Sequence, residues 1–176
     1  SSIAHAGYML MCGAILSTNA INAILFYLVV YLFMNLGAFF FAIFISNKLG
    51  VENVEDYKGL GYKSPLMASI MVLLLVSLTG LPPTSGFIGK VYLFAALIES
   101  NSFYWLAVVG ILNSVISLFY YFNIARSMWL DEPSDDSKIN PHPAISLIII
   151  ICSVPTILFG IKWGILHDFI YNSILF

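Results

Sequence analysis

Long apolar stretches separated by short polar segments dominate the pattern of this chain. They cover about residues 4–16, 20–47, 65–98, 103–129 and 144–163. A helix rises about 1.5 Å per residue and the hydrocarbon core of a bilayer is about 30 Å thick, so a spanning helix needs about 20 apolar residues. All stretches but the first reach that length. The pattern predicts an all-α, polytopic transmembrane helix bundle with about five membrane segments.

The third stretch is interrupted near its middle. Its first half begins with Pro65, which suits the first turn of a helix. Pro82 and Pro83 then remove two backbone donors and clash with the preceding turn, and Gly86 follows, so the helix must break. Non-helical backbone at membrane depth is tolerated only where it is buried in protein or lines a watery cavity. Broken helices of this kind mark ion sites in transporters, so we expect a functional site here.

Lys90 follows Gly86 by four residues and has apolar neighbours on both sides. A lysine near the centre of a membrane helix costs about 2.5–3.5 kcal/mol on insertion scales, so it should face the protein interior. Burial also disfavours the charged ammonium, which suits a group that takes up and releases protons. We therefore predict that Lys90 is a proton carrier. The alternative is that Lys90 snorkels to the membrane interface with its stem packed on Phe94.

Other polar side chains recur at helical spacing in the first, second and fourth stretches, which places hydroxyl, amide and imidazole groups on one face of each helix. Such groups could hold waters in a proton path around Lys90, with His5 as a relay because an imidazole titrates near neutral pH. Alternatively, they form hydrogen bonds that only hold the helices together. Both interpretations stay open. The residues of the predicted path besides His5 are Tyr8, Tyr31, Asn35, Asn113, Ser117 and Tyr121.

Composition excludes a soluble domain. Hydrophobic residues make up 60% of the chain and charged residues 9%, and the mean hydropathy is +0.95; soluble domains carry about 25% charged residues. The net charge of −2 without a basic run argues against a nucleic-acid partner. No cluster has metal-ligand spacing and no glycine-rich loop follows a strand, so we predict no metal or cofactor site. Cys12 and Cys152 lie in apolar stretches and are predicted to be core residues without a disulfide.

Two polar segments, residues 48–63 and 130–143, hold most of the charge. If each apolar stretch crosses the membrane once, both segments lie on the same side. The connections at residues 17–19 and 99–102 carry no Lys or Arg. The positive-inside rule therefore predicts that the charged side is cytoplasmic, or the matrix or stroma of an organelle. The basic residues on that side are Lys48, Lys58, Lys63, Arg126 and Lys138.

The two ends of the chain carry further expectations. Residues 163–176 form an amphipathic tail whose aromatic residues predict an interfacial helix at headgroup level. The chain opens with Ser1 and has neither an initiator Met nor a basic leader before an apolar stretch, so we expect a piece of a longer polypeptide. Residues 1–176 would then form a single membrane domain.

Three motifs resemble those of a known family. They are SSIAHAGY at residues 1–8, YLFMNLGAF at residues 31–39 and LTGLPPTSGFIGK at residues 78–90. Their sequence, order and spacing are similar to those of the antiporter-like membrane subunits of the proton-translocating NADH:quinone oxidoreductase, respiratory complex I, and within them to subunit N. The resemblance extends over essentially the whole chain and would cover only the C-terminal part of a full-length subunit.

The resemblance implies a fold of two inverted five-helix repeats, each with one discontinuous helix that carries a lysine. This chain would hold most of the second repeat and a final helix. Lys90 would be the lysine of the second discontinuous helix, in the outlet half of the proton path, and His5 would lie in the hydrated central axis. Related antiporter-like subunits carry a further lysine where this chain has Asn35, which cannot carry a proton; this departure favours subunit N.

The resemblance also implies a function. The chain would belong to a subunit that helps couple electron transfer from NADH to quinone to proton export, in the bacterial cell inner membrane or an organellar inner membrane. NADH, FMN, iron–sulfur clusters and quinone would be bound by other subunits, so this would be a non-redox part of the enzyme. Its partners would be other antiporter-like and small helical membrane subunits and the lipid bilayer. The alternatives are a subunit of a multisubunit cation/proton antiporter of the same superfamily and a purely structural scaffold segment.

Overall fold

The structure, a computed structural model, describes residues 1–50, 53–100, 102–133, 138–139 and 141–174. All regular elements in these residues are helical, which confirms the predicted all-α fold. The elements are α1 (Ser2–Gly13), α2 (Thr18–Leu49), η1 (Val54–Tyr57), α3 (Leu60–Lys63), α4 (Pro65–Thr79), α5 (Ser85–Glu99), α6 (Tyr104–Leu130), α7 (Pro143–Ile161) and α8 (Trp163–Ile174).

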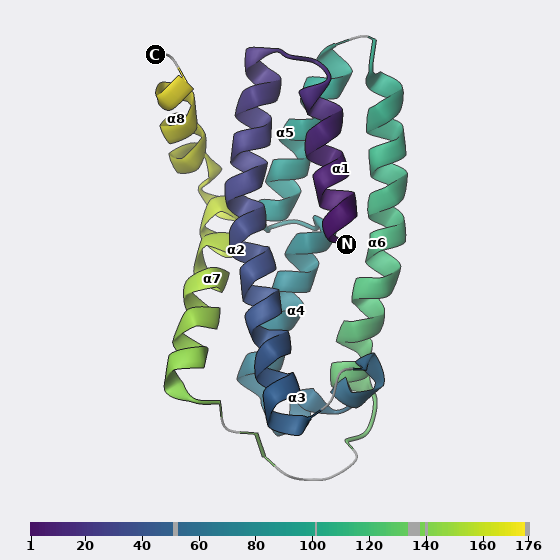
Figure 1. The fold of residues 1–176 in the computed structure, drawn as a ribbon, viewed down its shortest axis with the longest axis vertical. Helices are drawn as coiled ribbons and strands as arrows, with labels where there is room; N and C mark the ends of the chain where they lie inside the picture. The colour runs from purple at the N-terminus through teal and green to yellow at the C-terminus, as the bar shows by residue number, and fades with distance from the viewer. Residues whose placement is uncertain (51–52, 101, 134–137, 140, 175–176) are drawn as a thin grey trace.

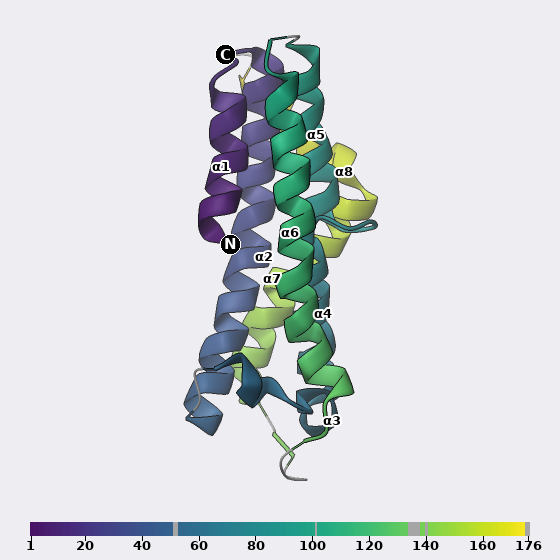
Figure 2. The same ribbon diagram turned by 90° about the vertical axis from the view of Figure 1, so that its right-hand side faces the viewer.

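The long helices run along one axis, and α2 passes through the centre of the bundle (Figures 1 and 2). Among the described residues, three helices, α2, α6 and α7, are long and apolar enough by themselves to cross a membrane. Helices α4 and α5 have 15 residues each, so neither reaches about 20 residues. They follow one another along the bundle axis and together extend over its height (Figure 1).

The predicted break lies between α4 and α5. Pro65 begins α4, as expected, and Gly80 ends it in the left-handed conformation at φ +85°. The Gly80 N–H donates to the carbonyls of Val76 at 3.0 Å and Ser77 at 2.9 Å. Helix α5 begins only at Ser85, so the two prolines lie in the non-helical connection. The sequence prediction of one discontinuous helix is confirmed.

The two charged segments lie together at one end of the bundle (Figure 1). The backbone N–H of Ile139 donates to the carbonyl of Lys63 at 3.1 Å, and that of Gly59 to the carbonyl of Ser127 at 3.1 Å. These bonds bring the two segments together at one end of the bundle; that they share the cytoplasmic side of the membrane stays a prediction. Of the charged residues in these segments, Glu52, Asp135 and Asp136 lie outside the described residues.

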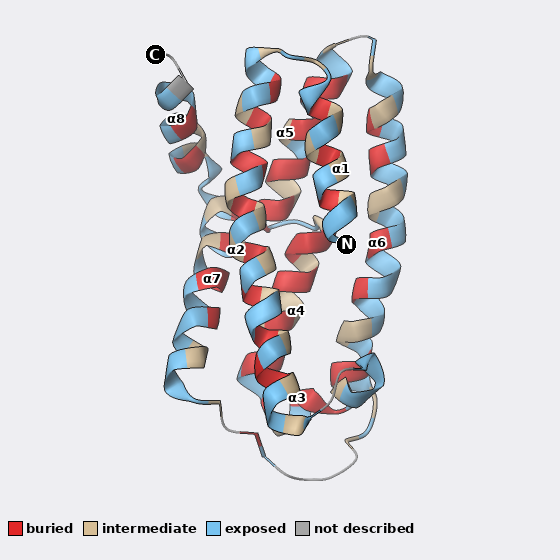
Figure 3. Cartoon of the chain, in the orientation of Figure 1, coloured by how far each residue is buried: buried red, intermediate tan, exposed pale blue. Residues whose placement is uncertain are grey.

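Buried positions lie on the helix faces that point toward one another, whereas outward faces are exposed although they are apolar (Figure 3). On α6 the side chains of Ile116 and Phe119 are 64% and 80% exposed. A water-soluble protein rarely exposes a continuous apolar face of this size. Lipid or neighbouring membrane protein is therefore the surrounding medium, and the chain is a multi-pass membrane segment.

The C-terminal part of the chain is interrupted at Lys162, between α7 and α8. Helix α8 packs against the bundle, where Leu166 and Ile170 are buried and the ring of His167 stacks on Tyr92 of α5 with 5.5 Å between centroids. One face of the amphipathic tail is thus covered by protein. Its placement at headgroup level stays a prediction, and residues 175–176 of the tail lie outside the described residues.

Candidate functional site

Lys90 lies in the second turn of α5, directly above the break, and its side chain is only 4% exposed. Its Nζ atom donates to the carbonyl of Thr79 at 2.7 Å, to the carbonyl of Leu78 at 3.1 Å and to Ser114 Oγ at 3.2 Å. An ammonium group has three N–H donors, so all three find an acceptor. The lysine faces the protein interior, as its sequence environment predicts; its role as proton carrier stays a prediction.

The end of α4 explains why a cation fits at this place. The last carbonyls of a helix lack intrahelical partners and form the negative end of its dipole. Lys90 donates to two of these carbonyls, those of Leu78 and Thr79. The ring of Tyr8 adds a further attraction, because Nζ lies 5.0 Å from its centroid. The broken helix therefore forms a binding site for a positive charge at membrane depth.

Gly80 leaves the space that the lysine occupies. A Cβ atom added at Gly80 would lie 2.7 Å from Cδ of Lys90, closer than two carbon atoms can approach. The positive φ of this residue also disfavours any side chain there. Glycine is thus required at position 80 both by the backbone and by the lysine stem.

Ser77 fixes the opposite side of the break. Its Oγ accepts the backbone N–H of Gly86 at 3.1 Å and donates to Sδ of Met34 on α2 at 3.4 Å. A Cβ at Gly86 would lie 1.9 Å from the Ser77 carbonyl oxygen, so this close approach needs glycine. From the other side, Gly160 of α7 packs on the backbone of Pro83, where an added Cβ would lie 2.1 Å from its carbonyl oxygen.

Hydroxyl groups lead from Lys90 to α1. Ser114 Oγ accepts from Lys90 and lies 3.1 Å from the hydroxyl of Tyr8. The amide of Asn113 donates to the same Tyr8 hydroxyl at 3.1 Å. Because the serine hydroxyl accepts from the lysine, its own proton is free to point at Tyr8. Lys90, Ser114 and Tyr8 thus form a continuous hydrogen-bonded path between α5, α6 and α1.

His5 belongs to a second polar group on the same side. Its side chain is 2% exposed, with Nδ1 2.6 Å from the hydroxyl of Tyr27 and Nε2 3.4 Å from that of Tyr121. The ring also stacks on Tyr31 with 4.8 Å between centroids. Within the described part of the chain, His5 and Tyr8 meet only edge to face, at 5.8 Å between centroids, without a hydrogen bond. The lysine path and the His5 group are therefore neighbours rather than one continuous hydrogen-bonded chain.

The remaining predicted path residues differ in their placement. Ser117 donates to the carbonyl of Asn113 at 2.9 Å and accepts from Tyr120 at 3.1 Å, so its bonds stay within α6. Asn35 is half-buried on α2 and makes no hydrogen bond among the described residues. The structure brings Tyr8 and Asn113 to the lysine path, and Tyr31 and Tyr121 to the His5 group.

Two contributors are absent from the predicted path. Ser114 lies three residues before Ser117 and seven before Tyr121, so helical spacing alone includes it in that stripe. Tyr27 lies four residues before Tyr31 and carries the shortest bond to His5. Spacing gives both residues the correct face, but it does not show which of several polar residues on that face meets a partner.

A cavity of about 280 Å³ borders the lysine on the side of α6. Ser114 and Gly80 line it near Lys90, whereas its other walls, including Phe87 and Val115, are mostly apolar. Among the described residues no group of three or more His, Cys, Asp or Glu side chains could hold a metal ion. The chemistry that this arrangement offers is proton binding at one amine and proton transfer through hydroxyl groups.

A family model described as NADH:quinone oxidoreductase/Mrp antiporter, transmembrane, matches residues 1–117. The chain is 48% identical over 178 residues to NADH-quinone oxidoreductase subunit N 2 from Sorangium cellulosum, covering 99% of this chain and 35% of the relative. It is 45% identical to NADH-quinone oxidoreductase subunit N from Chlorobium chlorochromatii, covering 100% of this chain and 36% of the relative. The chain thus spans about a third of the length of these relatives.

Two solved assemblies contain similar folds. A chain of respiratory complex I from Thermus thermophilus superposes with a TM-score of 0.79 at 26% identity, covering 95% of this chain and 38% of that one. A chain of the Mrp complex from Dietzia sp. DQ12-45-1b superposes with a TM-score of 0.84 at 20% identity, covering 96% and 40%. At that lower identity the second match shows the fold alone.

Proposed function

Because the chain belongs to the transmembrane family described as NADH:quinone oxidoreductase/Mrp antiporter, we propose that it is part of a proton-translocating subunit N of NADH:quinone oxidoreductase. The subunit helps couple electron transfer from NADH to quinone to proton export. NADH, FMN, iron–sulfur clusters and quinone are bound by other subunits, and this chain has no redox role. The partners are other membrane subunits and lipid, and the bacterial relatives favour the cell inner membrane.

The binding site of the Lys90 ammonium at the helix break is the observation that carries this proposal. The ammonium is buried in a broken helix, bonded to two α4 carbonyls and linked to a hydroxyl path. When Lys90 releases a proton to Ser114 Oγ, that hydroxyl passes its own proton to Tyr8, and the Tyr8 hydroxyl in turn releases the proton it carried toward His5. A change of the electric field from elsewhere in the complex alters the proton affinity of the lysine and so drives this step.

His5 is the proposed relay beside this path. It lies against Tyr8 and is bonded to Tyr27 and Tyr121. A neutral imidazole donates from one nitrogen and accepts at the other, so it can pass a proton between two hydroxyl groups. A water between His5 and Tyr8 would complete the connection that ring contact alone does not provide.

The competing proposal is a subunit of a cation/proton antiporter. The Mrp match supports only the fold, whereas the relatives at 45–48% identity bear the name of subunit N. A further alternative is a scaffold segment in which the polar contacts only hold helices together. The two alternatives differ from the main proposal in what they transport and in whether Lys90 matters for transport.

Lys90→Met in the full-length subunit, within the assembled complex in membrane vesicles, tests the proposal. NADH-driven proton pumping is measured after assembly has been verified, and Lys48→Met, which removes an exposed lysine of the charged end, is the matched control. We expect pumping to fall strongly in Lys90→Met and to be unchanged in Lys48→Met. Unchanged pumping in Lys90→Met would support the scaffold alternative, and sodium-coupled transport that is independent of NADH would support the antiporter.

A further inference from the structure

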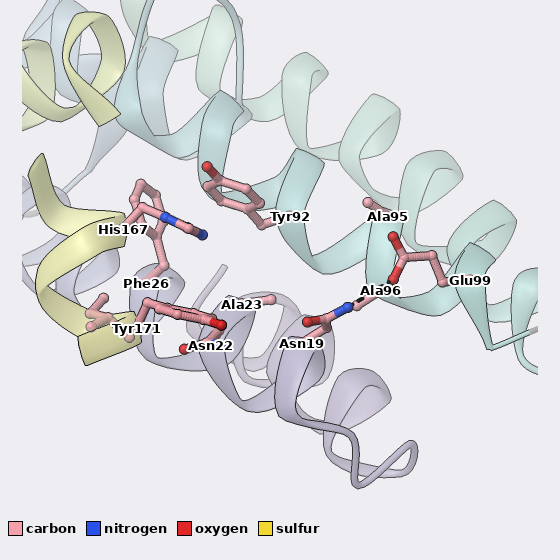
Figure 4. Close-up of a pocket in the computed structure, with 11 residues that line it drawn as sticks. Asn19, Asn22, Ala23, Phe26, Tyr92, Ala95, Ala96, Glu99, His167 and Tyr171 are labelled. Atoms are coloured by element: carbon pink, nitrogen blue, oxygen red, sulfur yellow. Dashed lines mark hydrogen bonds between the residues drawn. The ribbon is translucent and has the colours of Figure 1, made fainter. Parts of the chain in front are cut away.

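We propose that a pocket at the end of the bundle remote from the charged segments binds the ammonium head of an organic amine. The pocket has a volume of about 210 Å³ and lies between the first half of α2, the second half of α5 and α8 (Figure 4). Drug-sized ligands occupy about 300–1,000 Å³, so this volume suits a small head group. Nothing in the functional assignment above accounts for this site.

The pocket is separate from the proton site. It is lined on α5 by Tyr92 and Glu99, whereas Lys90 points to Ser114 on α6. Residues two apart on a helix are separated by about 200° around its axis, so Lys90 and Tyr92 face different sides. The ligand proposed here is therefore independent of the proposed proton translocation.

The charges at the pocket favour a cation. Glu99 lines it, and no Lys or Arg is among the described residues of its wall. One oxygen of the Glu99 carboxylate accepts the amide of Asn19 at 3.2 Å (Figure 4). A carboxylate offers about four lone-pair positions, so most of its acceptor capacity is left for a ligand. An anionic ligand would meet this carboxylate without a lysine or arginine to compensate it.

An unpaired acceptor on α2 points to a donor in the ligand. The Oδ1 atom of Asn22, a residue of the pocket wall, is buried and has no hydrogen-bond partner among the described residues. A buried acceptor without a donor is unfavourable, and such an atom in a native structure calls for an explanation. A small movement of the Asn22 side chain would be needed to expose Oδ1 to a ligand, and an ammonium group would then supply the missing N–H donor.

Aromatic rings select an organic ammonium rather than a metal ion. His167 stacks on Tyr92 with 5.5 Å between centroids and on Tyr171 with 6.1 Å, and Phe26 packs on Tyr92 at 5.0 Å. All four rings line the pocket. Tyr92 and Glu99 lie seven residues, or about 10 Å, apart along α5, so the rings suit the carbon part of an amine whose ammonium binds Glu99, whereas hard metal ions require several oxygen ligands.

Two sources supply this head group: an aminolipid such as phosphatidylethanolamine, and a free amine in solution. The pocket is lined by Asn19 near the start of α2 and by Glu99 at the end of α5. Both of these helix ends lie at the same end of the bundle (Figure 1). In the proposed membrane orientation this end is close to the lipid head groups. Both sources are accessible there, and the test below separates them.

The test uses the full-length subunit in its complex, in nanodiscs of phosphatidylglycerol that contain a small share of either phosphatidylethanolamine or its N-acetyl derivative. These two lipids share the phosphate and the acyl chains, and the N-acetyl derivative carries a neutral amide in place of the ammonium. Bound lipid is measured by native mass spectrometry, and thermal denaturation is measured with ethanolamine in solution. Glu99→Gln removes the carboxylate charge, and Glu55→Gln changes an exposed carboxylate at the other end.

We expect phosphatidylethanolamine to be retained at least about tenfold better than its N-acetyl derivative, the ratio that one lost charge contact typically produces. Glu99→Gln should abolish this preference and Glu55→Gln should keep it. Stabilisation by ethanolamine without a lipid preference would identify a free amine as the source. Equal retention of both lipids without stabilisation by ethanolamine would overturn the proposal, and this comparison needs only the wild-type protein.

Discussion

Lys90 and the helix break compensate for each other. The break leaves carbonyls at the end of α4 without partners, which is costly in a membrane because lipid supplies no donors. A buried ammonium is also costly unless it is fully hydrogen-bonded. In this chain the ammonium of Lys90 donates to the carbonyls of Leu78 and Thr79. The carbonyls thereby gain a donor and the ammonium gains acceptors. Removing either one is expected to affect both stability and transport.

Gly80→Ala tests the binding site of the Lys90 ammonium without changing any charge. The substitution places a Cβ 2.7 Å from Cδ of Lys90, so the lysine must move away from the carbonyls. Gly50→Ala is the matched control, since Gly50 also ends a helix at positive φ but has open space around it. Both changes should lower the free energy of unfolding by about 1–2 kcal/mol, because a side chain is strained at positive φ.

Proton pumping distinguishes the two glycine variants. We expect Gly80→Ala to impair NADH-driven pumping in assembled complexes and Gly50→Ala to leave it at the wild-type rate. Equal pumping in the two variants would show that the position of the lysine is not critical for transport.

Ser114→Ala tests the hydroxyl path from Lys90 to Tyr8. The Ser114 hydroxyl makes two hydrogen bonds, to Lys90 and to Tyr8, and each such bond in a membrane contributes only about 0.6 kcal/mol, so assembly should be unaffected. The pumping rate should fall by about tenfold, since a positioned proton-transfer group contributes about 10²–10⁴-fold and a water replaces part of this effect. Ser114→Thr keeps the hydroxyl and should restore most of the rate. If alanine and threonine pump equally well, the path does not run through position 114.

At the scale of the helices, the break is held by one contact between its two halves and by contacts with two neighbouring helices, α2 and α7. Ser77 links α4 to the start of α5 and to Met34 on α2. Gly160 brings α7 against the backbone of Pro83. These contacts fix the angle between the half-helices, and that angle determines where Lys90 can reach.

Gly160→Ala is expected to separate α7 from the break. The nearest atoms to the added Cβ are backbone atoms, with the Pro83 oxygen at 2.1 Å, and backbone cannot move aside as a flexible side chain can. Overpacking of this kind costs about 1–3 kcal/mol, so thermal denaturation of the purified complex should occur at lower temperature. Gly164→Ala, in α8 with nothing within 4 Å of an added Cβ, should be close to neutral. Similar denaturation temperatures for the two variants would contradict the close packing.

At the scale of the whole molecule, the charge of the loops is concentrated at one end, and this arrangement predicts the orientation in the membrane. Exposed Lys58, Lys138 and Ser102 can each be replaced by cysteine, one at a time, to report on which side of the membrane each connection lies. We expect an impermeant thiol reagent to label Lys58→Cys and Lys138→Cys only from the cytoplasmic side and Ser102→Cys only from the opposite side. The native Cys12 and Cys152 are buried and should react slowly. Labelling of all three positions from one side would refute this topology.

The sequence by itself determined the helices and the position of the break, and it predicts that the two charged segments share a side. These features depend on local properties: the length of an apolar stretch, the missing donors of Pro82 and Pro83, and the number of crossings between loops. The burial of Lys90 could also be predicted from its sequence neighbours, because an ammonium group within an apolar membrane helix is costly unless it faces the protein interior. The resemblance to the family also depends on short sequence motifs, so the sequence alone could suggest it.

Only the tertiary structure decided which polar groups meet. Ser114 rather than Ser117 contacts Lys90, Tyr27 binds His5, and Asn35 has no partner among the described residues, although helical spacing gives similar weight to each. The packing of α8 against α2 and α5 is likewise invisible in the sequence. Spacing fixes which residues share a face of one helix, but the rotation and angle of that helix in the bundle are set by contacts with distant segments.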